Sequence, residues 1–373
     1  MIMKYSFFIL YLVFIFNSCD QTQQDYNVFT IETDITSNAE LTLSKYFDNF
    51  RMIKLSNDSI MGEIEIIRFE NNRIYISDGK SIFIFSDSGE LLSCFNKRGG
   101  GPGEYAGITD FVVDGENITV LSRSIKRLLT YTNSGECIST QTLDYWAQAI
   151  SPTVENVYFL YCGNEFDDKQ KHKLRRINNE KEDSQYLPVD KKYLNFSWKS
   201  NFFKYQKSLY FFELFNDIVY EYVNGGSIEP LYYINYKGKN IPDAFFERNF
   251  NDVREFRMEY DKTSYAHGIF KFSLNDRFIM FGSSYLKKSK LTILDRKDQI
   301  SNTFATVKDD VYFNRSTPVS FYYFVDKHIF VPLETFEVVE WKKVHPPAEP
   351  FKEIVDSTKE EDNPLLLIFD FKK

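Results

Sequence analysis

"RIYISDGKSIFIFSDSGELLSCF", residues 73 to 95, is followed by a second copy of its pattern, "NITVLSRSIKRLLTYTNSGECIST", residues 117 to 140. Each copy contains an apolar, β-branched run, a polar loop, a second apolar run and a turn that ends in Ser-Gly-Glu. A Ser-Gly pair between two such runs is typical of a tight β-hairpin turn. Each copy therefore predicts three consecutive antiparallel strands.

Weaker copies of this unit continue to the end of the chain. The strand that matches the first strand of each copy begins near Ile74, Ile118, Val157, Leu209, Phe278 and His328. Another candidate strand precedes each of them, such as "ITDFVVDG" at residues 108 to 115. Units of roughly 40 to 60 residues with four strands each are typical of β-propeller blades. The sequence predicts an all-β, six-bladed β-propeller of four-stranded blades.

The two ends of the repeat region complement each other. The last unit ends at Phe371 after three candidate strands, and "FRMIKLSND", residues 50 to 58, belongs to no unit. If this N-terminal strand pairs with the last blade, the ring closes and an exposed sheet edge disappears. We therefore expect closure by an N-terminal strand.

Two segments interrupt the strand pattern. Residues 241 to 264 carry apolar side chains at helical spacing, which predicts a short helical insertion between blades four and five. The insertion either covers a gap in the ring or lines a binding cleft. The proline-rich residues 344 to 364 predict an exposed loop inside the last blade.

The N-terminus has the layout of a secretory signal: one lysine, an apolar run that is short for a membrane span, and then Cys19. Residues 16 to 19, "FNSC", are similar to a lipobox, in which the cysteine receives lipid chains. The alternative is an ordinary signal peptide that is cut nearby. The expected organisation is a signal peptide at 1–18, a tether at 19–45 and the propeller at 46–373.

The composition of the chain limits the classes of partner and site that it can have. The net charge is −8 with both signs interspersed, which argues against nucleic acid as a partner. Three further cysteines, Cys94, Cys137 and Cys162, show neither disulfide nor zinc spacing, and we expect them to be small buried residues. The four histidines form no metal-ligand pair, and no nucleophile motif is present. We expect no metal and no cofactor.

The stretch "RGGGPGEYAGITDF", residues 98 to 111, contains the letters of a dinucleotide fingerprint. That motif must lead into a helix, whereas this stretch leads into a predicted strand, so a nucleotide site is excluded. Its glycines instead suit a crossing between two blades. The Glu104 carboxylate could accept backbone N–H groups of this loop, pair with Arg98, or contact a ligand.

This region also carries a resemblance. In order, the chain shows a lipobox, "MGEIEII" at residues 61 to 67, an "IYIS" strand, a Ser-Gly turn and a "GPGEY" loop. It thereby resembles the NHL-like, six-bladed β-propeller lipoproteins of Gram-negative gut bacteria. The outline covers residues 1 to 371, and the specific motifs lie within residues 60 to 136. The resemblance implies a fold and an envelope location; most members of the family have no assigned activity.

Crossings between blades emerge on one face of a propeller, around the mouth of its central channel. The predicted topology gathers there Arg98, Glu104, Tyr105, Trp146, Trp198, Lys199, His267 and Arg315. Aromatic rings beside hydrogen-bonding cations suit the recognition of a sugar or an anionic group. We take these residues as the candidate ligand site.

The function predicted from the sequence is a ligand-binding or scaffold module of the cell envelope, lipid-anchored to the outer membrane through Cys19. We expect a monomer whose partner is a glycan, a peptide or an envelope protein. The alternative is a lyase or hydrolase that acts on a glycan or peptide with residues at the channel mouth. A third reading is a subunit of a membrane complex.

Overall fold

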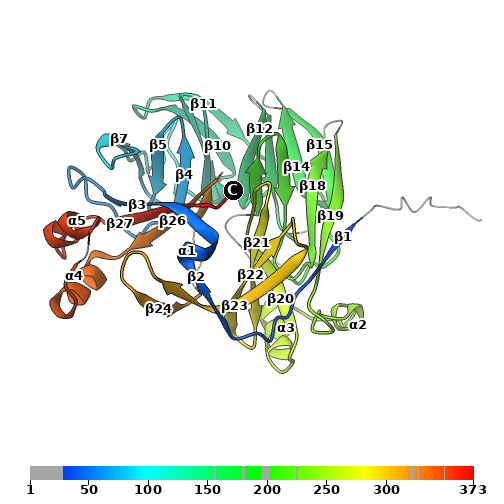
Figure 1. Cartoon of the computed structure of the whole chain (residues 1–373). Coiled ribbons are helices and arrows are strands. Elements are labelled where there is room, and N and C mark those ends of the chain that lie inside the picture. Colours follow the sequence, from blue (N-terminus) through cyan, green and yellow to red (C-terminus); the bar gives the residue numbers. More distant parts are fainter. Residues whose placement is uncertain are drawn as a thin grey trace, which may run out of the picture.

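The structure is a computed structural model, and it describes residues 28–154, 157–165, 167–178, 181–194, 201–223, 226–319, 323–325, 327–347 and 349–373. Six sheets follow one another around a ring (Figure 1). This confirms the predicted six-bladed β-propeller. The expected signal peptide and Cys19 lie outside the described residues.

Each blade is built from four antiparallel strands, numbered along the chain. The first two blades contain β4 (Ile66–Glu70), β5 (Arg73–Ser77), β6 (Ile82–Ser86), β7 (Leu91–Phe95), then β8 (Asp110–Asp114), β9 (Asn117–Ser122), β10 (Arg127–Thr132), β11 (Cys137–Thr142). The next two contain β12 (Ala149–Val154), β13 (Val157–Tyr161), β14 (His172–Asn178), β15 (Lys181–Pro188), then β16 (Phe202–Tyr205), β17 (Ser208–Phe211), β18 (Ile218–Val223), β19 (Ser227–Asn235). The fifth contains β20 (Ala266–Leu274), β21 (Phe278–Tyr285), β22 (Lys288–Asp295), β23 (Ile300–Asp309), with β24 (Arg315–Pro318) beside β23. The sixth contains β25 (Tyr323–Val325), β26 (His328–Leu333), β27 (Leu365–Phe371) and β3 (Phe47–Lys54).

Apolar side chains fill the space between neighbouring blades. Tyr75 of blade one and Phe111 and Tyr131 of blade two are completely buried in one cluster. Because strand side chains alternate between the two faces of a sheet, each middle strand contributes to the cores on both of its sides. The sequence shows such strands as nearly continuous apolar runs, "RIYIS" and "IFIFS" among them.

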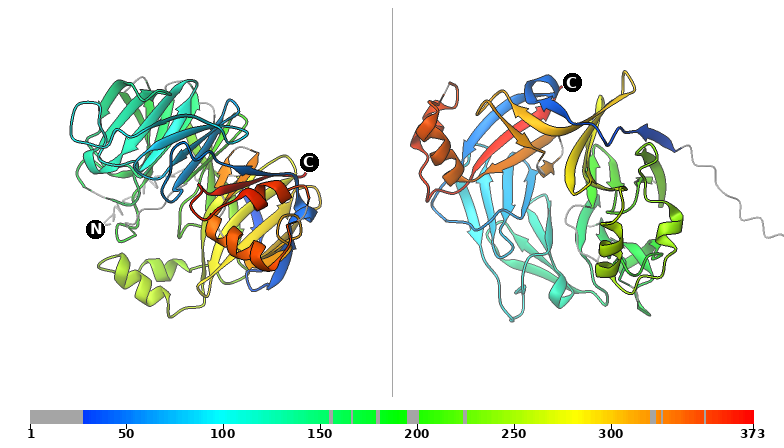
Figure 2. Two further views of the ribbon diagram at one scale, coloured as in Figure 1. Left: turned by 90° about the vertical axis from the view of Figure 1, so that its left-hand side faces the viewer. Right: turned by 90° about the horizontal axis from the view of Figure 1, so that it is seen from below.

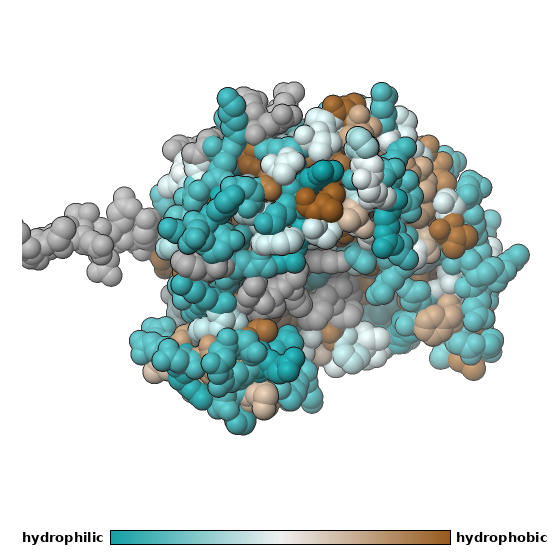
Figure 3. Space-filling model, turned by 180° about the vertical axis from the view of Figure 1, so that it is seen from behind, coloured by the Kyte–Doolittle hydropathy of each residue, from teal (hydrophilic) through white to brown (hydrophobic). Residues whose placement is uncertain are grey.

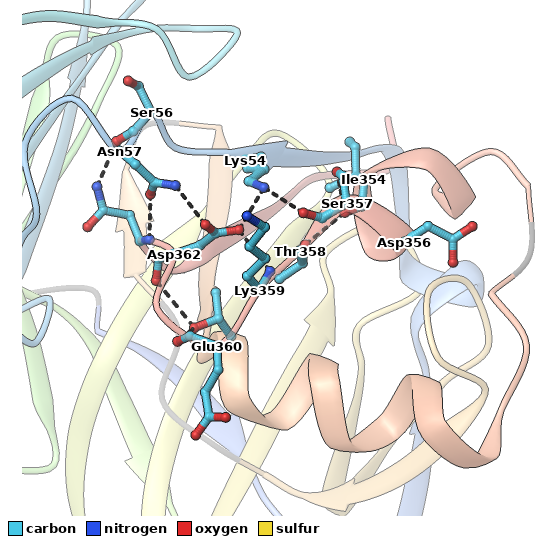
Figure 4. A network of polar contacts seen from close by, with 12 residues as sticks. Lys54, Ser56, Asn57, Ile354, Asp356, Ser357, Thr358, Lys359, Glu360 and Asp362 are labelled. Carbon is cyan, nitrogen blue, oxygen red and sulfur yellow. Dashed lines mark hydrogen bonds and ion pairs between the residues drawn. The ribbon is translucent and has the colours of Figure 1, made fainter.

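The ring is closed by the N-terminal strand, as predicted. β3 pairs antiparallel with β27, with Lys54 opposite Leu365 and Phe47 opposite Phe371. Polar contacts continue this pairing beyond the strand end (Figure 4). The Lys54 ammonium lies 2.6 Å from the Asp362 carboxylate, and the Asn57 side chain donates to Asp362 over 2.7 Å. Closure thus joins residues that are far apart in the chain.

Part of the expected tether is folded, which corrects the prediction of a tether at 19–45. β1 (Phe29–Glu32) pairs in parallel with β19, and β2 (Ala39–Thr42) pairs in parallel with β23. Figure 2 shows this segment, in dark blue, running along the outside of the ring before it enters the last blade. Ile31 and Ile35 are buried, and the Lys290 ammonium donates to the Ser37 carbonyl over 2.5 Å. The short helix α1 (Leu43–Tyr46) leads from β2 into β3.

The helical insertion between blades four and five is confirmed. It consists of α2 (Asp243–Phe246) and α3 (Val253–Tyr260). The Asp252 carboxylate accepts hydrogen bonds from the backbone N–H groups of Arg254 and Glu255, each over 2.9 Å, which caps the start of α3. Phe256 of α3 is completely buried among the aromatic side chains of this insertion.

The last blade differs from the predicted loop at 344–364. Two helices, α4 (Thr335–Val344) and α5 (Lys352–Ser357), lie between β26 and β27. Phe351, directly before α5, and Val355 within α5 are buried. The Lys342 ammonium donates to the carbonyls of Val355, Asp356 and Thr358, over 3.1, 3.1 and 2.6 Å. This lysine satisfies carbonyls at the C-terminal end of α5, so the segment is a packed element and not a free loop.

No helix within the described part of the chain is long and apolar enough to cross a membrane.

Candidate functional site

The first strand of each blade lines the ring axis, and the segment that crosses from one blade to the next ends where that strand begins. Because all first strands run in the same direction along the axis, the crossings lie at one end of the ring. We call this end the crossing face. Most of the predicted site residues lie there, and the structure gives each of them specific contacts.

The glycine-rich crossing is held by its own carboxylate. The Glu104 carboxylate accepts a hydrogen bond from the backbone N–H of Gly101 over 2.7 Å. The backbones of Arg98 and Tyr105 pair with each other in an isolated parallel β-bridge. A Cβ atom on Gly99 would lie 2.1 Å from a Glu104 carboxylate oxygen, so a side chain at Gly99 would displace the Glu104 carboxylate from this position. The loop leads into β8, a strand, which agrees with the exclusion of a nucleotide site. The carboxylate of Glu104 thus stabilises the loop.

Tyr105 is a packing residue. It is completely buried, its hydroxyl donates to the Lys80 carbonyl over 2.8 Å, and burial raises the pKa of Tyr105 to about 12. Its ring cannot reach a ligand on the crossing face. The sequence could not show this, because the burial depends on the loop folding back over blade one.

Trp146 is half-buried between two cations. The guanidinium of Arg123 lies 5.2 Å and the ammonium of Lys126 lies 4.3 Å from its ring centre. Arg123 also forms an ion pair with Glu165, and the Trp146 backbone N–H donates to Gln170 over 3.2 Å. The ring therefore sits in a polar seam between blades two and three.

His267 fastens the helical insertion to blade five. Its Nδ1 lies 2.6 Å from the Tyr260 hydroxyl, and its ring stacks on Phe215 with 4.3 Å between ring centres. Burial, helped by the nearby Arg257, lowers the pKa of His267 to about 4. The imidazole is neutral at neutral pH and acts as a hydrogen-bonding aromatic ring.

Arg315 is the first residue of β24, where it lies opposite Asp309, the last residue of β23. Its guanidinium lies 3.3 Å from the Glu337 carboxylate of α4 and 5.5 Å from the centre of the Phe313 ring. Trp198 and Lys199 lie outside the described residues. Among the described members of the predicted set, no contact joins Trp146, His267 and Arg315 to one another.

A cavity of about 440 Å³ follows the ring axis. Its walls come from the first strands of all six blades, and six charged side chains line it: Arg68, Glu70, Asp110, Asp114, Lys204 and Lys271. Cavities of this size are typical of small-molecule sites. We call it the axial cavity.

Arg68 and Asp110 form a closed pair in the axial cavity. They are 2.6 Å apart, and Asp110 also accepts the backbone N–H groups of Phe111 and Ile150, over 2.8 and 2.9 Å. Arg68 further donates to the Phe111 carbonyl over 3.1 Å. One buried carboxylate thereby links the first strands of blades one, two and three.

The sequence reasoning missed these cavity residues. A signal exists, since these charges belong to short strands that are otherwise mostly apolar: two charges in "IIRFE" of β4, two in "DFVVD" of β8, one in "FFKY" of β16 and one in "AHGIFKFSL" of β20. In a propeller, the first strand of a blade faces the axis, so such charges point to the channel.

Two buried amides near the crossing end of the axial cavity have unused hydrogen-bonding atoms. Asn201 is completely buried and lines the cavity; its nitrogen donates to the Phe212 carbonyl over 3.1 Å, and its oxygen has no partner among the residues that the structure describes. Gln148, directly before β12, is 1% exposed, and neither atom of its amide has a partner within the described part of the chain. Buried polar atoms without partners are rare, and they mark places where water or a ligand can bind.

Within the described ranges, no group of three potential metal-ligating side chains is present. Cys162 is buried with its thiol pKa raised by burial, whereas Cys94 is exposed, contrary to the expectation for that cysteine. The outer surface seen in Figure 3 is mostly hydrophilic, with hydrophobic residues in separate small groups.

Comparison with known sequences identifies the family. The sequence profile described as "Domain of unknown function (DUF4934)" matches residues 26–370. The chain belongs to the DUF4934 family. The match begins close to β1 and reaches the end of β27, so the N-terminal strands of this DUF4934 chain are part of the family domain. The comparison with curated proteins finds no match.

Solved structures agree with the fold of this DUF4934 chain. A crystal structure described as a "Putative exported protein" of Bacteroides fragilis superposes with a TM-score of 0.74 at 16% identity, covering 93% of this chain and 100% of that chain. A member of the DUF4221 family from Bacteroides vulgatus gives a TM-score of 0.51 at 11% identity, covering 87% and 97%. At these identities the likeness concerns the fold.

Proposed function

We propose that this DUF4934 chain is a ligand-binding module of the cell envelope whose ligand occupies the axial cavity. The observation that carries the proposal is the cavity itself: all six blades contribute to it, and its walls combine charged side chains with the unused oxygen of Asn201. Ligand pockets commonly join an apolar wall with a few convergent polar groups.

The location forms part of the same proposal. The signal-like segment and Cys19 support export and lipid anchoring at the outer membrane, and the structural relative from Bacteroides fragilis is described as exported. Cys19 and Phe29 are ten positions apart in the chain, which allows β1 to lie at most about 35 Å from an anchored cysteine. We also propose that the chain is an NHL-like propeller and that it is a monomer.

The crossing face is proposed as the entrance. At this entrance, Trp146 supplies an aromatic ring, and Arg98 and Arg315 supply cationic side chains. These groups suit a glycan, a peptide or an envelope protein that arrives at the cavity mouth. Trp198 is assigned to the same entrance from its place in the sequence. Tyr105, Glu104 and His267 support this entrance through packing and hydrogen bonds.

A plugged cavity tests the proposal. Ser151 lines the axial cavity and is buried, so Ser151→Trp should fill it, whereas Thr142→Trp adds the same ring to the exposed outer strand β11. A peptide and glycan library is screened on the purified protein by thermal shift. Ligands of the native protein should lose binding with Ser151→Trp and keep it with Thr142→Trp. Binding that is unchanged by Ser151→Trp, in a variant whose circular dichroism is native, would place the site elsewhere.

A further inference from the structure

β16, the first strand of blade four, has a free edge that faces the axial cavity. It ends the strand order β1-β19-β18-β17-β16 of its sheet, and β17 is its partner among the described strands. Asn201, directly before β16, lines the cavity, as do Phe202, Phe203 and Lys204 within the strand. A free edge exposes backbone N–H and C=O groups with which another extended chain can pair.

The pairing with β17 fixes which backbone groups of β16 face the cavity. The backbone C=O of Asn201 accepts the Phe212 N–H over 3.0 Å, so it points towards β17. Successive residues of a strand point their N–H and C=O groups to opposite sides. The groups of Phe202 and Lys204 therefore point away from β17 and towards the axis. No hydrogen bond within the described part of the chain takes them up.

Side chains take up backbone groups on the first strands of blades two and three. The Arg68 guanidinium donates to the Phe111 carbonyl over 3.1 Å. The Asp110 carboxylate accepts the backbone N–H of Ile150 over 2.9 Å. On β16, by contrast, the structure adds an acceptor: the side-chain oxygen of Asn201, buried and without a partner among the described residues, lies at the crossing end of the strand. A ligand beside β16 therefore meets both backbone groups and this oxygen.

The sheet of blade four already carries an added strand at its outer edge. There, β1 pairs in parallel with β19, from Phe29 opposite Tyr232 to Glu32 opposite Asn235. The edge of blade five is used in the same way, because β2 pairs in parallel with β23. Two blades of this chain thus bind an extended segment through a free edge.

We infer that the axial cavity binds an extended peptide, which pairs with β16 through its main chain. The inference rests on the function proposed above, and it selects the peptide among the ligands named there. The main chain of the peptide pairs with the axis-facing groups of Phe202 and Lys204, and one further N–H donates to the Asn201 side-chain oxygen. β16 has four residues, so the paired segment is about four residues, or about 13 Å, long.

The spacing of these groups favours a peptide over a glycan. An extended peptide presents one donor and one acceptor on the same side at every second residue, which is the pattern of a free strand edge. The hydroxyl groups of a glycan do not repeat in this way. Because the contacts are made by the main chain, a peptide without any charge should bind.

The test uses the blocked tetrapeptide N-acetyl-L-alanyl-L-valyl-L-threonyl-L-alanine amide as the probe, with isothermal titration calorimetry on the purified full-length protein. The matched control is its depsipeptide analogue, in which an ester replaces each internal amide, so that the side chains stay and the N–H donors are lost. We expect the tetrapeptide to bind roughly tenfold or more tightly than the depsipeptide, since acceptors of the protein then stay unpaired. Equal binding of the two, or no binding of the tetrapeptide, overturns the inference.

Two variants of Phe202 test the place of the pairing. Phe202→Pro removes the axis-facing N–H and keeps the hydrogen bonds between β16 and β17, whereas Phe202→Ala also loses the ring but keeps the N–H. Pro152 lies two residues after Ile150, whose N–H points to Asp110, so the fold accepts a proline on this edge of a first strand. We expect Phe202→Pro to bind the tetrapeptide roughly tenfold more weakly than Phe202→Ala does.

The outcomes separate this inference from the proposed function. If the two variants of Phe202 have native circular dichroism and bind the tetrapeptide equally, the pairing with β16 is wrong; if Phe202→Pro does not fold, the depsipeptide comparison still decides. If the library yields glycans alone, and Ser151→Trp abolishes their binding, the inference fails while the proposed function stands. If Ser151→Trp leaves tetrapeptide binding intact, both fail.

Discussion

The ammonium of Lys54, in the closing strand, lies 2.6 Å from the carboxylate of Asp362, in the loop that precedes β27. Lys54 also donates to the Ser357 carbonyl over 2.9 Å, and Asp362 accepts a hydrogen bond from Asn57 (Figure 4). The Asp362 side chain is 5% exposed. This pair joins the strand that closes the ring to the blade that it completes.

Loss of the Lys54 ammonium should weaken the closure. We expect Lys54→Met to lower the free energy of unfolding by about 1 to 2 kcal/mol at pH 7, because Asp362 then remains buried without its cation. Burial alone would raise the pKa of Asp362, but hydrogen bonds from Lys54, Lys359 and Asn57 prevail and lower it. The stabilisation is present above the unfolded carboxyl pKa and is lost as the pH falls through the lower folded pKa. Urea unfolding at pH 7 and at pH 3 measures both effects, and a difference between native and variant protein that is as large at pH 3 as at pH 7 would contradict this account.

A second pH dependence of stability is expected from His267, which is a base that is neutral in the folded protein, whereas Asp362 is an acid that is ionised in it. Its folded pKa is about 4, below the ordinary value of 6.5, because the ring is buried. The unfolded chain therefore binds a proton at a higher pH than the folded chain does. The contribution of the neutral ring is full above pH 6.5 and is lost as the pH falls from 6.5 through 4. Over this range native stability should drop by about 1 to 3 kcal/mol from this residue.

His267→Phe removes the titrating group and keeps the stacking partner of Phe215. We expect the variant to be less stable than the native protein at pH 7.5, since the hydrogen bond between the imidazole and the Tyr260 hydroxyl is lost, and to lose less stability on acidification. Urea unfolding at pH 7.5, 6 and 4.5 gives the comparison. Parallel pH profiles of the two proteins would show that His267 is not the group that titrates.

The sequence predicted the parts of this fold that depend on neighbouring residues. The Ser-Gly turns at Gly89 and Gly135 repeat because each hairpin needs a positive φ at the same place, which a local pattern reveals. The pairing of β1 with β19 was missed, because Ile31 lies opposite Ile234, far away in the chain. Two short strands without alternation carry little local signal.

The candidate site was predicted less well, for a related reason. The role of Tyr105 depends on burial beneath its own loop, and the position of Lys271 depends on a bulge within an otherwise regular apolar strand. Neither burial nor a bulge is visible in spacing alone. The charges inside apolar strands would have pointed to the axis once the fold was known.

The Arg68–Asp110 pair should contribute to stability as well as to the cavity wall. We expect Asp110→Asn to lower the free energy of unfolding by about 2 to 3 kcal/mol, because Arg68 keeps its charge in a partly buried place while its partner becomes neutral. The double variant Arg68→Met, Asp110→Asn should recover part of this loss. Arg73 and Glu116 form a matched pair between the same blades, 3.0 Å apart but exposed. Arg73→Met should change stability by less than about 1 kcal/mol, and a loss equal to that of Asp110→Asn would contradict the distinction.

The repeated hairpin turns should be intolerant of any side chain. Gly135 has a φ of 80°, and a Cβ atom there would lie 2.7 Å from the Phe95 side chain of the preceding blade. Gly115, in the turn between β8 and β9 of the same blade, has a φ of 63°, and a Cβ atom there would lie in open space. Gly115→Ala should therefore cost about 1 kcal/mol from backbone strain alone, and Gly135→Ala about 2 to 4 kcal/mol, because Phe95 must also move. Urea unfolding of the two variants measures the difference, which reports how tightly blade two is packed against blade one. Equal losses would mean that the blades can separate at this turn without cost.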